Sequence, residues 1–362
     1  MSKKVLPVRH RCIDLVRGFA AFAVLIWHYQ HFYHPAAGVG MPLDLRASQP
    51  FYKWLWPMYH YGLFAVELFW ALSGFVFAAA YLTCRPTART FLVNRIARLY
   101  PLHLLTLIIV ASLQLASLWI VGHYQIYAAN DAYHFLLNIG MVQAWGFQEG
   151  FSYNAPTWSV SIEIAIYVVF FTSIPVLARF PLAGSLGCLT VAICIRILSN
   201  SLFIECAMFF YVGVVCWAVS YRNRRCAIFL SLKFFVLFAI IKFYLEYKFY
   251  KCELIFLFAS VILLSSFLDK YFPERFVGLD WFGNATYSTY LLHVPLQIAV
   301  LIVLQWLAVD QIQFAQHGWV LIGFVATVFA LGVASYRFIE APARSKVKLA
   351  FLLSYRNSQS PH

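Results

Sequence analysis

Long apolar stretches alternate with short polar and basic segments along nearly the whole chain. A stretch of about 20 apolar residues is long enough to cross the hydrocarbon core of a bilayer as a helix. The pattern therefore predicts an all-α polytopic membrane protein with about ten transmembrane helices. The expected spans are 12–33, 60–82, 99–121, 157–178, 182–201, 204–220, 227–245, 253–268, 285–308 and 317–337.

Composition supports this fold class and excludes others. Of the 362 residues, 62% are hydrophobic and 11% are charged, whereas a soluble domain has roughly 45–50% apolar and about 25% charged residues. Disorder requires low hydrophobicity and high charge, so it is excluded as well. The eight cysteines are scattered and form no C-x-x-C pair, which excludes a disulfide scaffold.

The basic residues are distributed unevenly between the two sides of the predicted membrane. Of 27 Lys and Arg residues, 19 fall on one side of the ten spans and 5 on the other. The positive-inside rule assigns the basic side, and with it both termini, to the cytoplasm. This distribution accounts for the net charge of +13. We therefore expect the lipid bilayer as a partner and no nucleic acid.

The first span carries three ionisable residues on one face, Asp14, Arg17 and His28. Arg17 and His28 are 11 residues apart, so they point the same way on a helix and lie about 16 Å apart along its axis. Asp14 lies one turn before Arg17 and can pair with it. Ionisable groups inside a membrane are costly and usually functional. The alternative is an interfacial ion pair and a structural histidine.

Two carboxylates are expected at the depth of His28, in the outer half of the bilayer. Glu67 and Glu163 each lie six or seven residues into a span counted from the outer side. A carboxylate there could hold the Nδ1 proton of a histidine and leave Nε2 as a base. The alternative for each is a buried carboxylate that other side chains satisfy.

Two arginines mark the cytoplasmic mouth of the third span. Arg95 and Arg98 are three residues apart, and two guanidinium groups on one helix face suit a phosphate or diphosphate. The alternative is that they only determine topology.

Further histidines remain ambiguous. His293 precedes Pro295, which can free a backbone carbonyl, and we expect it near the level of Arg17 as a cavity-lining or a structural residue. His31 and His34 are expected at the membrane interface. No His, Cys or Glu cluster has metal-ligand spacing, so no metal is expected.

Six segments in order resemble the acyltransferase 3 family of membrane O-acyltransferases, and the resemblance covers nearly the whole chain. They are Arg17-x10-His28, Leu68–Phe75, Arg95–Pro101, Pro156–Tyr167, Tyr287–Pro295 and Glu340–Pro342. The resemblance implies one transmembrane domain over 1–348 followed by a cytoplasmic tail over 349–362. It also implies a multi-pass protein of the bacterial plasma (inner) membrane.

The activity that the resemblance implies is transfer of an acyl group, usually acetyl, from cytoplasmic acyl-CoA to a sugar hydroxyl. The acceptor would be a cell-surface or lipid-linked polysaccharide, such as lipopolysaccharide or exopolysaccharide, at the outer face. The enzyme would be an O-acyltransferase for groups other than aminoacyl groups. A second Glu that often follows the position of Glu163 in the family is Ile164 here.

The resulting site hypothesis has a catalytic part and a donor-binding part. His28 is the expected catalytic residue, either as a general base or as a transiently acylated group, together with Arg17, Glu67 and Glu163. The expected ligands of acetyl-CoA or another acyl-CoA are Arg95, Arg98, Arg17 and His293.

Other functions remain open from the sequence. The main alternative is a transporter or flippase of a lipid-linked glycan, whose intramembrane charges would line a substrate or proton path. A membrane acyltransferase of the MBOAT type and a structural subunit of a polysaccharide-export complex are further alternatives.

Overall fold

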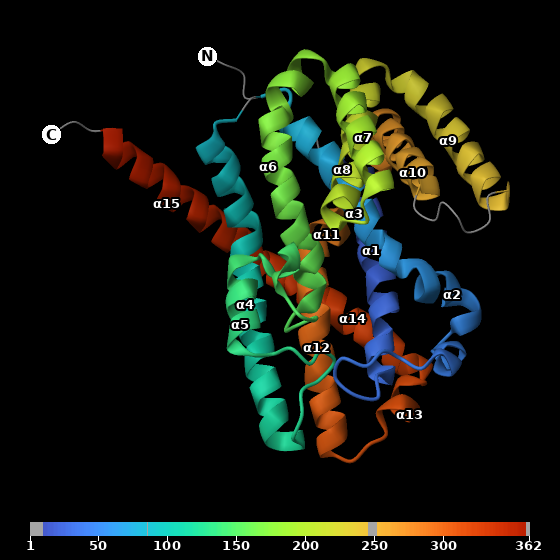
Figure 1. Cartoon of the computed structure of the whole chain (residues 1–362), viewed down its shortest axis with the longest axis vertical. Helices are drawn as coiled ribbons and strands as arrows, with labels where there is room; N and C mark the ends of the chain where they lie inside the picture. The colour runs from blue at the N-terminus through green and yellow to red at the C-terminus, as the bar shows by residue number, and fades with distance from the viewer. Residues whose placement is uncertain (1–9, 85, 245–251, 360–362) are drawn as a thin grey trace. The chain divides into compact units, whose positions relative to one another are not determined.

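The computed structural model describes residues 10–84, 86–244 and 252–359, and these residues form helices joined by loops, with no strand among them (Figure 1). Within these ranges, nine helices are long and apolar enough to cross a membrane. The predicted class, an all-α polytopic membrane protein, is confirmed. The predicted span 227–245 corresponds to α9 (Arg224–Tyr244) but runs past the described residues, and it is not among the nine.

The chain divides into two compact units. The first contains the chain up to Ala20, Val66–Pro86 and Ile162–Gly283. Within it, α8 packs against α7, α9 and α10 (Figure 1). Its helices are the first part of α1 (Arg11–His28), α3 (Ala65–Tyr81), most of α6 (Trp158–Arg179), α7 (Pro181–Leu198), α8 (Leu202–Arg222), α9, α10 (Cys252–Tyr271), the 3-10 turn η6 (Pro273–Phe276) and α11 (Asp280–Asn284).

Two glycines bring α3 and α8 into backbone contact. A Cβ atom built on Gly213 of α8 would collide with the carbonyl oxygen of Ala71 in α3, and one on Gly74 of α3 would collide with the carbonyl oxygen of Phe210 in α8. Helices in a membrane gain little from the hydrophobic effect, so such close approach through small residues is a main source of their association.

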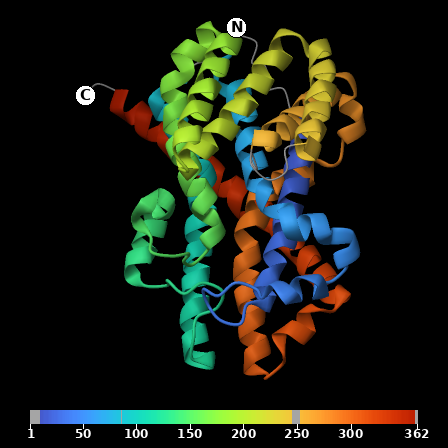
Figure 2. The ribbon, with the colours of Figure 1, turned by 45° about the vertical axis from the view of Figure 1, so that its right-hand side comes forward.

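The second unit contains Ala21–Ala65, Thr87–Ser161 and Asn284 onward. In it α12 packs against α4 and α14, and α15 packs against α4 (Figure 1). Its helices and turns are the end of α1, η1 (Tyr29–Tyr33), η2 (Leu43–Ser48), α2 (Tyr52–Tyr61), η3 (Gly62–Phe64), α4 (Ala88–Val121), α5 (Ala132–Gly140), η4 (Gln143–Phe147), η5 (Ala155–Thr157), α12 (Thr286–Trp306), α13 (Gln311–Ala315), α14 (Gly318–Ser335), η7 (Tyr336–Glu340) and α15 (Ala341–Gln359). Figure 2 shows α5 and the loops around it beside α4.

The long helix α4 begins well before the predicted span at 99. Thr87 caps its N-terminus, because the Thr87 hydroxyl accepts a hydrogen bond from the Thr90 backbone N–H at 3.2 Å. A Thr in this position satisfies one of the unpaired N–H groups of a first helical turn. Arg95 and Arg98 therefore lie inside a regular helix, on the same face.

Candidate active site

Helix α1 carries three of the predicted site residues. The Nη1 atom of Arg17 lies 3.5 Å from Oδ1 of Asp14, which confirms the predicted pairing. His28 is the last residue of α1. Since an α-helix rises 1.5 Å per residue, the backbone of α1 separates Arg17 from His28 by about 16 Å along its axis.

The His28 imidazole is held by its own helix. His28 is 8% exposed, and its Nδ1 lies 3.0 Å from the backbone carbonyl of Val24. A carbonyl only accepts hydrogen bonds, so Nδ1 donates and Nε2 keeps its lone pair. This partner differs from the carboxylate expected from the sequence, because the carbonyl one turn earlier lies within reach of the side chain. The chemical result is the same, an oriented imidazole with Nε2 as a base.

His293 of α12 is arranged in the same way. Its Nδ1 donates to the carbonyl of Tyr290 at 2.6 Å, and its Nε2 is buried without a hydrogen-bond partner in the described structure. The centres of the His293 and His28 rings are 4.7 Å apart. His293 therefore lies at the level of His28 and not, as the sequence suggested, near that of Arg17. Counting residues from a span end assumes that every helix starts at the same depth, and α12 does not follow that assumption.

The proline two residues after His293 has the predicted effect. Pro295 has no N–H to donate to the carbonyl of Leu291 in the preceding turn. The side-chain amide of Asn154 donates to that carbonyl at 2.9 Å. This hydrogen bond connects the loop before α6 to α12, two residues before His293.

A row of three histidines extends from the end of α1. The chain continues after His28 as the 3-10 turn η1, in which side chains three residues apart eclipse one another. The ring centres of His28 and His31 are 5.0 Å apart, and those of His31 and His34 are also 5.0 Å apart. His31 is 4% exposed and is thus buried within the protein, and its predicted depth at the membrane interface stays a prediction. The described residues contain no group of three or more His, Cys, Asp or Glu arranged to hold a metal ion.

Gln297 of α12 fixes this row. Its Nε2 donates to the backbone carbonyl of His28 at 2.8 Å, and its Oε1 accepts from Nδ1 of His31 at 2.9 Å. The hydroxyl of Tyr127 donates to Nε2 of His31 at 3.3 Å. Both nitrogens of His31 are therefore occupied, and of the two imidazoles that contact His28, His293 is the one with an open nitrogen.

The two predicted glutamates are buried in the first unit. Glu67 in α3 is 4% exposed and Glu163 in α6 is 9% exposed. Both carboxylates act electrostatically on the thiol of Cys206 in α8, as does Glu205. These two glutamates therefore gather at one place in their unit, and their participation in the chemistry of His28 stays a prediction.

A cluster of four cations lies where α15 packs against α4. Arg95 and Arg98 come from α4, and Arg344 and Lys348 come from α15. Arg344 interacts electrostatically with both α4 arginines, and Lys348 interacts with all three arginines. All four side chains are partly exposed. So many like charges at one place favour binding of a polyanion, such as a phosphate or diphosphate.

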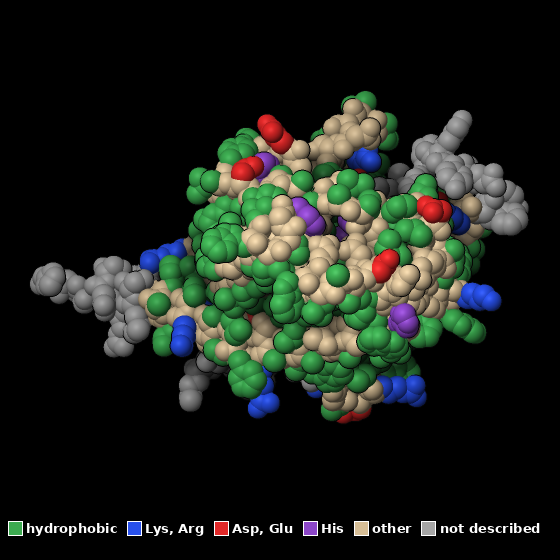
Figure 3. Space-filling model, turned by 90° about the horizontal axis from the view of Figure 1, so that it is seen from below, with side chains coloured by type: hydrophobic (Ala, Val, Ile, Leu, Met, Phe, Trp, Pro, Cys, Tyr) green, Lys and Arg blue, Asp and Glu red, His purple; other side chains and the backbone are tan. Residues whose placement is uncertain are grey.

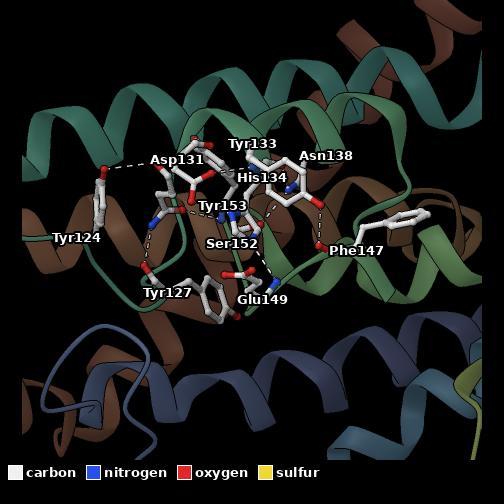
Figure 4. A network of polar contacts seen from close by, with 11 residues as sticks. Tyr124, Tyr127, Asp131, Tyr133, His134, Asn138, Phe147, Glu149, Ser152 and Tyr153 are labelled. Atoms are coloured by element: carbon white, nitrogen blue, oxygen red, sulfur yellow. Dashed lines mark hydrogen bonds and ion pairs between the residues drawn. The ribbon is translucent and has the colours of Figure 1, made fainter. Parts of the chain in front are cut away.

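The segment after α4 contains a histidine that serves structure instead (Figure 4). Asp131 caps α5 by accepting from the backbone N–H of His134 at 2.9 Å, and it also accepts from Nδ1 of His134 at 2.8 Å. These bonds, the backbone one first, hold the pKa of Asp131 below its usual value of 3.8. The backbone N–H of Glu149 donates to Nε2 of His134 at 3.3 Å. Both nitrogens of His134 are hydrogen-bonded, so this residue stabilises the loop and has no free nitrogen to act as a base.

The face that is seen from below in Figure 3 carries hydrophobic side chains mixed with other groups. Figure 3 shows this face, with histidine side chains beside a small hollow near its middle.

Sequence reasoning missed several residues of this arrangement. From the sequence, Arg344 and Lys348 are only two of the basic residues on the cytoplasmic side. Gln297 and Tyr127 carry no local signal, because their partners are far away in the chain. The spacing of His28, His31 and His34 at every third position was the one available signal.

Comparison with known proteins identifies the family. The model of an acyltransferase domain, that of the acyltransferase 3 family, matches residues 10–336. Neither the curated proteins nor the solved structures provide a match. The matched range contains five of the six segments that resemble the family, from Arg17-x10-His28 to Tyr287–Pro295, and it spans most of both units. The chain therefore belongs to the acyltransferase 3 family and is a multi-pass membrane acyltransferase.

Proposed function

We propose that the protein is an O-acyltransferase that moves an acyl group, acetyl in the simplest case, from acyl-CoA to a hydroxyl of a cell-surface or lipid-linked carbohydrate. The observation that carries this proposal is the His28 imidazole. Its Nδ1 donates to the Val24 carbonyl, so Nε2 is available as a base in a buried site. General base catalysis by an oriented imidazole is a standard way to activate a hydroxyl.

The proposed reaction uses this imidazole as its base. Nε2 of His28 removes the proton of the sugar hydroxyl while the oxygen attacks the thioester carbonyl. The C–O bond forms, the C–S bond breaks, and CoA leaves. A hydroxyl is a weak nucleophile at neutral pH, so the base supplies much of the rate.

The cation cluster supports acyl-CoA as the donor. Arg95, Arg98, Arg344 and Lys348 present donors suited to phosphate groups, and CoA carries a diphosphate and a further phosphate. Arginine forms bidentate bonds to phosphate, and lysine adds a point charge. In this proposal the CoA phosphates bind at the cation cluster. The end of the protein that carries this cluster faces the cytoplasm, and the membrane is a bacterial inner membrane.

The remaining sequence candidates belong to the proposal as well. Arg17, Glu67 and Glu163 are proposed to support the charged states of the reaction, and His293 to contact the thioester end of the donor. Substitution of each glutamate by Gln preserves its size and removes its charge, whereas substitution of Arg17 by Lys keeps the charge and removes the guanidinium group.

The test uses native membrane vesicles from cells that express the chain, with vesicles from cells lacking it as the blank. Labelled acetyl-CoA is added, and label in the extracted carbohydrate is measured. The decisive variant is His28→Asn, because an Asn amide can still donate to the Val24 carbonyl. The matched control is His317→Asn, since His317 is exposed and its Nδ1 likewise donates to the carbonyl four residues earlier, at 2.8 Å.

We expect transfer by the wild type and the control, and a loss of about 10²–10⁴-fold in His28→Asn. Label no higher than in the blank, or equal label with His28→Asn, would overturn the proposal.

A further inference from the structure

His28 and His293 form a pair of imidazoles with the same internal constraint. Each donates through Nδ1 to a carbonyl of its own helix, at 3.0 Å to Val24 and at 2.6 Å to Tyr290. Each therefore has Nε2 as its remaining proton-accepting atom. The ring centres are 4.7 Å apart, and both side chains are buried.

Of the two imidazoles that contact the His28 ring, His293 is the one that can accept a proton from it, because both nitrogens of the other are already hydrogen-bonded. His31 also contacts the His28 ring, but its nitrogens are engaged by Gln297 and Tyr127. The Tyr290 hydroxyl donates to the Pro156 carbonyl at 2.6 Å and contacts the Ser159 hydroxyl. A buried polar atom without a partner is costly unless a ligand or a reaction uses it. Nε2 of His293 is such an atom in the described structure.

We propose that His293 is a second catalytic residue, which receives the proton from His28 and delivers it to the sulfur of the departing CoA. This inference rests on the proposed acyl transfer and adds the route of its proton. Both imidazoles start neutral. His28 takes the hydroxyl proton on Nε2, passes it to Nε2 of His293, and becomes neutral again.

The reaction balances without any further proton donor or acceptor. The hydroxyl loses one proton and gains the acyl carbon, and the thioester loses its C–S bond. The electron pair of that bond stays on sulfur, which accepts the proton from His293. The products are the sugar ester and the CoA thiol, and both histidines return to their first state.

The arrangement also explains why two imidazoles stand together in a buried place. One buried imidazolium is costly, and two adjacent ones repel each other, so the pair carries at most one proton at a time. Such a pair passes a proton on without holding it, as a relay requires.

The test compares two donors whose leaving groups differ in their need for a proton. Acetyl-CoA releases a thiolate, and a thiol has a pKa of about 8.5. The acetyl ester of oxa(dethia)CoA, in which oxygen replaces sulfur, releases an alkoxide, which is far more basic and depends much more on protonation as it leaves. The two donors share all other groups, so their binding to the cation cluster is matched.

The variant is His293→Asn, whose amide can keep the bond to the Tyr290 carbonyl while Nε2 is lost. A second variant, His293→Gln, places an amide nearer the position of Nε2 and guards against a folding defect of the first. The control is His31→Gln, an equal change at the other imidazole that contacts His28. Folding is checked by size-exclusion chromatography and by CoA binding.

For His293→Asn and His293→Gln we expect transfer from acetyl-CoA to fall by about 10–100-fold and transfer from the oxygen ester to fall at least about tenfold further. His31→Gln is expected to show the same relative rate with both donors. Equal losses with both donors in the His293 variants, while the wild type transfers acetyl, would overturn the relay and leave the proposed function intact. Absence of transfer by the wild type from acetyl-CoA would instead overturn the proposed function itself.

Discussion

Gln297 offers the sharpest test of how the site is held. The side chain is fully buried and makes two hydrogen bonds, one to the carbonyl of His28 and one from the imidazole of His31. Substitution of Gln297 by Leu keeps a similar size and removes both. The carbonyl of His28 lies at the end of α1, where an α-helix leaves its last carbonyls without partners.

The expected loss of stability follows from the buried groups that the substitution leaves without hydrogen-bond partners. Each buried donor or acceptor that loses its partner costs about 1–3 kcal/mol. Two such groups, the His28 carbonyl and the His31 N–H, give a loss of about 2–6 kcal/mol in the free energy of unfolding. Combined with His31→Leu, the loss is expected to be less than additive, because the two changes share one bond.

The assay is unfolding in mixed detergent micelles, followed by helical circular dichroism, with Gln313→Leu as the control. Gln313 is exposed, and its backbone N–H and carbonyl form hydrogen bonds with Asp310 and His317. A Gln297→Leu protein as stable as Gln313→Leu, within about 0.5 kcal/mol, would refute the reasoning.

Three further predictions follow from other parts of the structure. Gly213→Ala is expected to destabilise the first unit by about 1–3 kcal/mol in the same unfolding assay, because its methyl group would meet the Ala71 carbonyl; an unchanged midpoint would contradict the close approach. Arg344→Ala is expected to raise the apparent KM for acyl-CoA about fivefold with little change in kcat, as measured in vesicles, and a fall in kcat alone would argue against phosphate binding there. The pKa of Asp131 is lowered by its bonds from His134, so the stability that it gives the loop is fully present above pH 3.8 and is lost as the pH falls through the lowered pKa. The protection of α5 against hydrogen exchange, taken relative to the intrinsic rate at each pH, should therefore fall as the pH drops through this lowered pKa, and Asp131→Asn should remove this dependence.

The pattern of apolar stretches predicted the helices well, because bilayer thickness fixes their length and lipid forbids unpaired backbone. The helical phase also placed Arg17 and His28 on one helix and paired Asp14 with Arg17, since these relations are local. The effect of Pro295 was equally predictable, because a missing N–H always leaves a carbonyl to satisfy.

Relations across the chain were not predictable in the same way. The contact between His28 and His293 depends on the depth of α12, which residue counting misjudged. The place of His31 depends on the change from an α-helix to a 3-10 turn at Tyr29, which no hydropathy pattern reveals. The addition of Arg344 and Lys348 to the arginines of α4 requires the packing of α15 against α4.

The widened turn η7 has a consequence for how this protein tolerates changes in chain length. The N–H of Ala341 bonds to the carbonyl of Tyr336, five residues back, so the turn holds one residue more than an α-helical turn. Deleting one residue there would restore a regular helix and rotate α15 by about 100° about its axis. Arg344 and Lys348 would then leave the face that meets α4. The number of residues between Ser335 and Ala341 therefore matters more for the cation cluster than their identity does, and deletion of one of them is expected to abolish the proposed donor binding while Arg344 and Lys348 stay in the sequence.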